Sequence, residues 1–240
     1  MMVWRCVKTV TASLENVDSV RAPLPTFRRA EHIMAMPAAD RERTRHWTAR
    51  EVRELIAVQP LGTPRYELVD GELLVSPAPR YRHQDVVARL HFALMQYLSA
   101  NPIGKALSSP FEVDLEDESL VQPDLFVLPS NEVRRLNVAE WRPAEALLLA
   151  IEVLSPSTAR YDRRTKRPLY QRHVPEYWIV DIDARLIERW HPGDEQPEII
   201  TKTLIWSPDG AAEPLAIEVD TLFADLPSGN DDSANERERR

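Results

Sequence analysis

Two acidic residues stand inside stretches of sequence that are otherwise apolar. Asp124 opens the run DLFVL, and Glu152 interrupts the run LLLAIEVL. Burying an ionised carboxylate is costly unless a cation or a set of hydrogen bonds compensates for the lost water. Two such acids on neighbouring strands would also repel each other. Their positions therefore indicate either a divalent cation between them or a buried arginine beside each.

A hard divalent cation would meet this need. Mg2+ binds through one or two carboxylates and several water molecules, and Mn2+ accepts similar oxygen ligands. Such an ion polarises a phosphodiester and generates a hydroxide nucleophile from bound water. We therefore interpret Asp124 and Glu152 as candidate catalytic residues and ligands of Mg2+ or Mn2+. Pairing with buried arginines is the alternative.

Lys166 is the third candidate catalytic residue, because this chain strongly prefers arginine. The 30 basic residues include four lysines, namely Lys8, Lys105, Lys166 and Lys202. Lys166 lies in a run that contains Arg160, Arg163, Arg164 and Arg167. A compact ammonium group can serve as a point charge for a water molecule or a phosphate, and its pKa shifts readily. The alternative is a helical surface pair with Asp162, four residues earlier.

Several further residues are weaker candidates. Glu72 follows a predicted turn and could add a carboxylate, and His83 at a predicted helix start could orient a phosphate or a water. Asp162 would share a helix face with Lys166. A surface turn acid and a helix-start histidine without a special role are the alternatives. The candidate nucleic-acid-binding residues are Arg160, Arg163 and Arg164, unless they form a solvated helix face.

The elements that would position these residues follow from periodicity and turn signals. Thr48 and Glu51 have the spacing of a capping box, and Asp70-Gly71 between the runs 65–69 and 72–76 predicts a β-hairpin. Residues 83–99 have the pattern of an amphipathic helix. Residues 158–172 form an Arg-rich helix that Pro168 should kink or end. Further strands are expected at 105–115, 121–128, 146–154, 177–182, 186–190 and 199–206.

The order of these elements predicts an α/β fold. Strands 146–154 and 177–182 are apolar on both faces, as strands covered by helices must be. A helix lies between them, so we expect them to run parallel through a crossover connection.

Several motifs also resemble a known family. They are YELVDGELLVSPAP, QPDLFV, IEVLSPST, the pair Asp162 and Lys166, and VPEYWIVD. Together with His83 they resemble the bacterial Uma-two endonucleases, a branch of the PD-(D/E)XK, restriction-endonuclease-like superfamily. The resemblance covers about residues 47–190.

The resemblance implies an αβββαβ core with a mixed sheet flanked by helices, preceded here by the N-terminal helix and hairpin. It also implies Mg2+-dependent phosphodiester hydrolysis. Pro123-Asp124 then stands for the PD, Glu152 for the acidic position and Val153 for the X, whose backbone carbonyl would join the metal site. Leu154 occupies the position where the superfamily motif has lysine. Lys166, from the following helix, is the candidate replacement.

Composition limits the remaining choices. A net charge of −8 argues against binding polyanions through bulk charge. The single Cys6 fits a reducing compartment, and no apolar run reaches the roughly 20 residues of a membrane helix. We expect a cytoplasmic protein whose partner is nucleic acid, DNA before RNA, with no membrane association. Whether it forms a homodimer stays open.

One folded unit is expected at residues 46–226. Residues 1–45 and 227–240 should be a disordered leader and tail, and Met34 or Met36 is an alternative start. A catalytically silent module that binds nucleic acid or a protein partner is the rival to a nuclease, since a fold alone does not establish activity.

Overall fold

The computed structural model of the protein describes residues 45–58, 64–136 and 142–226. The predicted tail, and the predicted leader except for its last residue, lie outside these ranges, so both stay predictions.

The first described elements are a helix and a hairpin. Helix α2 (Ala49–Ala57) begins at the predicted capping box, in which Thr48 and Glu51 satisfy each other's backbone N–H groups. Strands β1 (Arg65–Val69) and β2 (Glu72–Ser76) pair antiparallel around the predicted turn. Asp70 and Gly71 have φ values of 49° and 77°, which a type I′ turn requires. The predicted hairpin is confirmed.

Gly71 is expected to be critical for the position of this hairpin. A Cβ atom there would overlap the ring of His46, and left-handed backbone costs a residue with a side chain about 1–2 kcal/mol. Gly193 provides a matched control, because its φ is also positive, at 85°, but no atom lies within 4 Å of the added Cβ. Urea unfolding should show a larger loss of stability for Gly71→Ala than for Gly193→Ala. Equal losses would mean that the turn tolerates the displaced ring.

The main sheet has six strands in the order β3-β4-β5-β6-β7-β8. Their bounds are β3 Gly104–Ser108, β4 Leu125–Pro129, β5 Leu149–Val153, β6 Tyr177–Asp181, β7 Leu186–Trp190 and β8 Glu198–Ile200. Strands β5 and β6 run parallel, and each of the other neighbouring pairs is antiparallel. The predicted parallel crossover is therefore confirmed.

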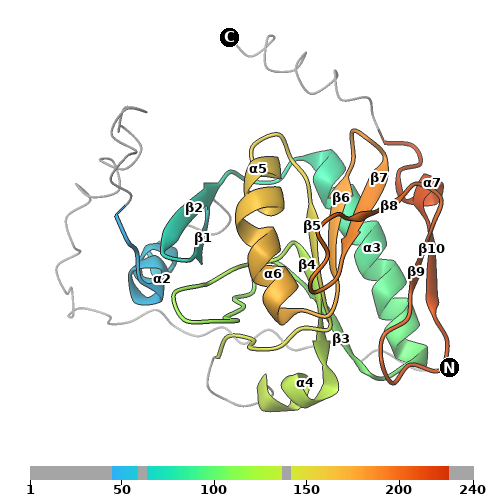
Figure 1. The fold of residues 1–240 in the computed structure, drawn as a ribbon, viewed down its shortest axis with the longest axis horizontal. Helices are drawn as coiled ribbons and strands as arrows, with labels where there is room; N and C mark the ends of the chain where they lie inside the picture. Colours follow the sequence, from blue (N-terminus) through green and yellow to red (C-terminus); the bar gives the residue numbers. More distant parts are fainter. Residues whose placement is uncertain (1–44, 59–63, 137–141, 227–240) are drawn as a thin grey trace, which may run out of the picture. The chain divides into compact units, whose positions relative to one another are not determined.

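Helices cover both faces of this sheet (Figure 1). Helix α3 (Tyr81–Ala100) packs on one face, together with the small hairpin of β9 (Thr203–Trp206) and β10 (Leu215–Glu218) and helix α7 (Val219–Leu222). The crossover helix between β5 and β6 packs on the other face. The order α3, β3, β4, β5, crossover helix, β6 is the expected αβββαβ core.

The crossover helix differs from a regular α-helix. It consists of α5 (Ala159–Tyr161), the π-helical turn η2 (Asp162–Lys166) and α6 (Arg167–His173). In the turn the Arg167 N–H donates to the Asp162 carbonyl, five residues earlier. Pro168 follows at once, and proline cannot donate to the carbonyl four residues before it. We predicted that Pro168 would kink or end the helix. The helix instead continues to His173, and its irregular part is the π turn that precedes Pro168.

Other predicted boundaries were wrong. The strand predicted at 105–115 ends at Ser108, and the strand predicted at 121–128 begins at Leu125. Pro110 and Pro123 lie in the intervening stretch, where they cannot donate ladder hydrogen bonds. The strand predicted at 199–206 is divided between β8 and β9, which belong to different sheets. Helix α4 (Ser130–Leu136), strand β10 and helix α7 were not predicted.

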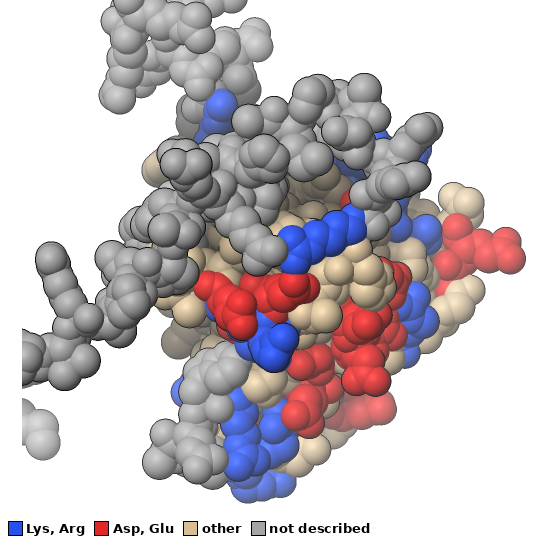
Figure 2. Space-filling model, turned by 90° about the vertical axis from the view of Figure 1, so that its left-hand side faces the viewer, with Lys and Arg blue, Asp and Glu red and all other residues tan. Residues whose placement is uncertain are grey.

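One face of the molecule is mixed in charge. On the face drawn in Figure 2, acidic and basic side chains lie beside each other, without a continuous basic strip across its described part. None of the helices in the described ranges combines the length and apolarity needed to cross a membrane.

Candidate active site

Strand alternation brings Asp124 and Glu152 to the same face of the sheet. Strands β4 and β5 pair with Leu125 opposite Ile151, so the next residues outward are Asp124 and Glu152. Leu125 and Ile151 pack on the α3 face, and their neighbours therefore project toward the crossover helix. The Val153 N–H donates to Asp124 Oδ2 at 2.9 Å, which joins the two strand ends.

Asp124 is surrounded by hydrogen-bond donors. Arg65 Nη2 donates to Oδ1 at 2.8 Å, and His83 Nε2 donates to Oδ2 at 2.9 Å. Burial alone would raise the pKa of Asp124, but the hydrogen bond and charge of His83, followed by the charges of Arg65 and Lys166, lower the pKa well below its usual range. Asp124 is therefore a carboxylate at neutral pH.

Glu152 lies in a less favourable environment for a negative charge. It is 1% exposed, and its Oε1 accepts hydrogen bonds from Lys166 Nζ and the Tyr170 hydroxyl, each at 3.1 Å. Burial raises its pKa well above the ordinary value, and the nearby acids, Asp124 first, raise it further against the opposing charge of Lys166. The ionised form of Glu152 therefore lacks sufficient positive charge around it.

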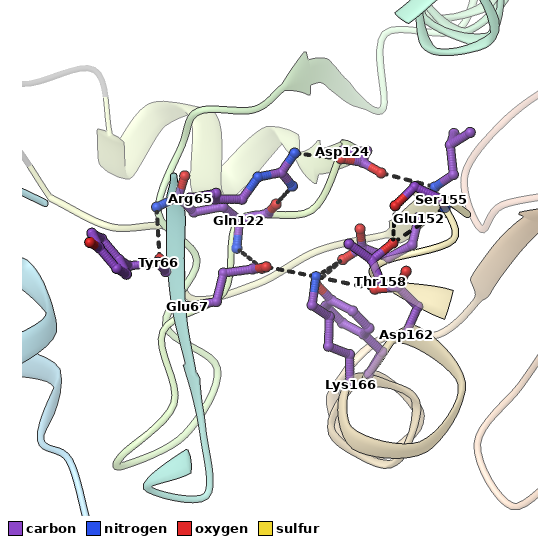
Figure 3. Close-up of polar contacts among 12 residues, drawn as sticks. Arg65, Tyr66, Glu67, Gln122, Asp124, Glu152, Ser155, Thr158, Asp162 and Lys166 are labelled. Atoms are coloured by element: carbon purple, nitrogen blue, oxygen red, sulfur yellow. Dashed lines mark hydrogen bonds and ion pairs between the residues drawn. The ribbon is translucent and has the colours of Figure 1, made fainter. Parts of the chain in front are cut away.

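Lys166 projects from the π turn into the centre of these acids (Figure 3). Its Nζ lies 2.8 Å from Glu67 Oε2, 3.1 Å from Glu152 Oε1 and 3.3 Å from Asp162 Oδ1. Burial would lower the pKa of Lys166, but the charges of Glu152, Glu67 and Asp162 raise it well above the ordinary value. The side chain is thus a buried ammonium group whose protonated form is favoured by the carboxylates around it.

These residues form an acid cluster in which carboxyl groups outnumber cationic groups, and burial raises the pKa of Asp162 as it does that of Glu152. It contains four carboxylates and two strong cations: Glu67, Asp124, Glu152 and Asp162 against Arg65 and Lys166. Glu67 Oε2 and Asp162 Oδ1 accept no directed hydrogen bond from the described residues, although both lie within ion-pair distance of the ammonium. A further cation would relieve the excess charge.

The donor set fits a magnesium-like ion only in part. Within the described ranges, no group of three or more His, Cys, Asp or Glu side chains is arranged to hold a metal ion. Mg2+ does not require such a group, because it keeps several waters and binds through one or two carboxylates. Asp124 and Glu152 are buried on adjacent strands, but both oxygens of Asp124 already accept hydrogen bonds, Oδ1 from Arg65 and Oδ2 from His83 and the Val153 N–H.

The acid cluster opens into a cleft of about 350 Å³. Asp124, Glu152, Asp162 and Lys166 contribute to its floor and walls. Its other basic lining residues are Arg65, Arg80, Arg82 and His83. One wall comes from the loop between β2 and α3, and the other comes from the loop after β5.

Some candidates from the sequence lie away from this cleft. Glu72 is exposed on β2 and is not among the residues that line the cleft. Arg163 donates to Asp181 and Glu188, both at 2.8 Å, so its guanidinium group is engaged within the fold. Arg160 and Arg164 are exposed and border a separate surface depression with Arg163. The arginines of the cleft lining are therefore Arg65, Arg80 and Arg82, not those of the Arg160–Arg164 run.

Sequence reasoning missed Arg65, Glu67 and Tyr170. Arg65 and Glu67 stand two residues apart on β1, which places both side chains on one face of the strand. This alternation is also that of an ordinary half-exposed strand, so the sequence did not single them out. Tyr170 follows Lys166 by four residues, and this spacing directs it to the same side of the helix.

Comparisons with known proteins identify the family of the chain and its fold. The model of the Uma2 (Uma-two) family, described as "Putative restriction endonuclease", matches residues 53–219. The chain is similar in fold to a structure titled as a putative nuclease belonging to DUF820 from Anabaena variabilis ATCC 29413, with a TM-score of 0.59 and 20% sequence identity. That alignment covers 72% of this chain and 97% of the other. No curated protein matches the sequence.

Proposed function

Because this chain belongs to the Uma2 family of restriction-endonuclease-like proteins, we propose that it is a metal-dependent endonuclease that hydrolyses phosphodiester bonds of nucleic acid, with DNA as substrate. The observation that carries the proposal is the convergence of Asp124, Glu152 and Lys166 in one cleft. Their separation in sequence makes this convergence a property of the fold. The chemistry of the three groups suits charge stabilisation at a phosphate.

The metal is Mg2+ or Mn2+ in this proposal. Asp124 and Glu152 would hold it, together with the backbone carbonyl of Val153. When bound, such an ion supplies a Lewis acid for the phosphodiester and lowers the pKa of a bound water. Its charge would also balance the excess of carboxylates, which explains why two buried acids stand side by side.

The protein's own residues would orient the substrate and stabilise charge. Lys166 keeps its proton because its pKa is raised, so it acts as a fixed positive charge beside the attacking water or the phosphate and does not accept a proton. Arg65 and His83 hold Asp124 in place through both carboxylate oxygens. Tyr170 orients the Glu152 carboxylate through its hydroxyl group.

One observation favours a catalytically silent module that binds nucleic acid or protein. Lys166 occupies the centre of the acid cluster, at ion-pair distance from three carboxylates. An ammonium group in that place already compensates part of the charge that a metal ion would otherwise balance. The two proposals differ in one measurable property, which is divalent-dependent cleavage.

A cleavage assay separates them. Purified protein is incubated with plasmid DNA, a linear duplex, single-stranded DNA and RNA in the presence of Mg2+, Mn2+ or a chelator. We expect cleavage of DNA with either ion and none with the chelator. Asp124→Asn, prepared in parallel, controls for contaminating nucleases. Absence of cleavage on every substrate, combined with no Mn2+ binding by isothermal titration, would support the silent module.

A further inference from the structure

Tyr81 is an exposed aromatic residue that lies, in sequence, between two residues of the cleft lining. Its side chain is 68% exposed, although it opens helix α3, whose other face packs on the sheet. Its neighbours in sequence, Arg80 and Arg82, both line the cleft. An exposed aromatic ring between cationic side chains is the combination that binds unpaired bases and their phosphates.

The depth of the acid cluster restricts the form of substrate that can reach it. Asp124, Glu152 and Lys166 are 5%, 1% and 2% exposed. The cleft volume of about 350 Å³ lies at the small end of the range of roughly 300–1,000 Å³ for small-ligand pockets. A stacked duplex is too rigid and wide to enter such a space, whereas a flexible single strand can direct one nucleotide into it.

The surface charge also disfavours a duplex track. The chain carries a net charge of −8, and the face in Figure 2 shows no continuous basic strip in its described part. Duplex binding without sequence preference depends on many phosphate contacts from Lys and Arg. The arginines that line the cleft are Arg65, Arg80 and Arg82, and these can contact only a few phosphates.

Arg82 has the properties of a phosphate contact. Its Nη1 donates to Asp183 Oδ1 at 2.9 Å, across the cleft lining, and Asp183 is 72% exposed on its side chain. An exposed ion pair of this kind is weak, so a phosphate can replace Asp183. Arg82 Nε is buried and has no hydrogen-bond partner among the described residues, so a side chain released from Asp183 would have a further donor to offer a phosphate.

We propose that the cleft receives an unpaired stretch of nucleic acid, with Tyr81 stacking on a base at the mouth and Arg82 binding the adjacent phosphate. This inference rests on the proposed function and specifies its substrate as single-stranded DNA or the unpaired end of a duplex. Asp183 then acts as a competitor that holds Arg82 until the phosphate arrives.

Fluorescence anisotropy in chelator tests this proposal, because binding is then measured without cleavage. The probes are a labelled mixed-sequence DNA single strand and the same strand in a duplex. The single strand should bind more tightly. Tyr81→Ala should weaken its binding about tenfold, the loss of one stacked base, and Tyr81→Trp should preserve it. Arg82→Gln should also weaken binding and reduce its salt dependence. Asp183→Asn should strengthen binding.

Phe92→Ala is the matched control. Phe92 is on the same helix, about three turns further along, and is 70% exposed, but unlike Tyr81 it has no sequence neighbour that lines the cleft. Equal losses for Tyr81→Ala and Phe92→Ala, or duplex binding as tight as single-strand binding, would overturn the inference. If single-strand binding follows the expected pattern but Mg2+ gives no cleavage, the inference is supported and the proposed nuclease activity is wrong. If duplex is cleaved faster than single strand, the proposed nuclease activity is supported and the inference is overturned.

Discussion

The variant Glu152→Gln is expected to lose cleavage by about a thousandfold and yet to be more stable than the unaltered protein when metal is absent. The loss of activity follows from removing one of the two carboxylates that would hold the metal. The metal's charge stabilisation of the transition state contributes several kcal/mol, and each loss of about 1.4 kcal/mol lowers the rate about tenfold. The gain in stability follows from the surroundings of Glu152. Its ionised form is buried among Glu67, Asp124 and Asp162 with too little positive charge nearby.

The change in stability of Glu152→Gln should depend on pH in a defined direction. The pKa of Glu152 is raised in the folded state, so folding favours its protonated form. That contribution to stability is full below the ordinary glutamate pKa, near 4.3, and is lost as the pH rises through the folded value. A neutral amide does not ionise. The advantage of Glu152→Gln should therefore be present at pH 7.5 and disappear near pH 4.

Asp124→Asn should behave oppositely in stability while also losing cleavage. The pKa of Asp124 is lowered in the folded state, mainly by His83 and Arg65 against burial. Its contribution is therefore full above the ordinary aspartate pKa, near 3.9, and is lost as the pH falls below it. Removing the charge leaves a largely buried arginine without its partner, which costs about 3 kcal/mol. We expect destabilisation at pH 7.5.

Urea unfolding of both variants in chelator, at pH 4 and pH 7.5, measures the two effects together. The arrangement of charges requires opposite signs at pH 7.5, since one carboxylate is stabilised by the fold and the other is not. If both variants shift the urea midpoint in the same direction at pH 7.5, the claim that the fold destabilises the ionised form of Glu152 is wrong. A divalent ion should reverse the advantage of Glu152→Gln, because it stabilises only the protein with both carboxylates.

The sequence was sufficient for those parts of the fold that depend on local patterns. The turn at Asp70-Gly71, the amphipathic helix α3 and the apolar strands β5 and β6 each have a distinct periodicity or turn signal, and all were predicted. Strand β10 and helix α7 were missed because their short segments, 215–218 and 219–222, have only one and two buried residues, respectively. Their positions depend on packing against α3, which a local pattern does not encode.

The sequence predicted those site residues whose type differs from that of their neighbours in the chain. Asp124 and Glu152 stood out because they interrupt apolar strands, and Lys166 stood out against the prevailing arginines. Glu67 did not, because alternation of polar and apolar residues on β1 looks like an ordinary half-exposed strand. Only the fold shows that this face of β1 is turned toward Lys166, with Glu67 0% exposed. Their catalytic roles stay predictions.

Lys166 should be essential for cleavage, and its removal should also have a large structural effect. Without the ammonium, Glu67, Glu152 and Asp162 face each other in a buried space, and breaking a buried ion pair costs about 3–5 kcal/mol. Lys166→Arg should not restore activity, because its planar guanidinium group differs from a compact ammonium in size and geometry. Inactivity of Lys166→Met alone would be ambiguous, since that variant is expected to fold poorly.

A pair of compensated variants removes this ambiguity. Glu67→Gln, added to Lys166→Met, removes one of the three facing charges and should recover stability in urea, but not cleavage. Leu154→Lys, introduced into that double variant, would place an ammonium two residues after Glu152, where the superfamily motif has it, and Leu154 already lines the cleft. We expect this third substitution to restore part of the cleavage rate.

The measurement is the initial rate on the preferred DNA substrate in Mg2+, with unfolding curves to verify the fold. Full cleavage by the folded double variant would show that Lys166 only balances charge. A folded triple variant without activity would show that an ammonium at the motif position cannot replace Lys166, and that the two positions are not equivalent in this fold.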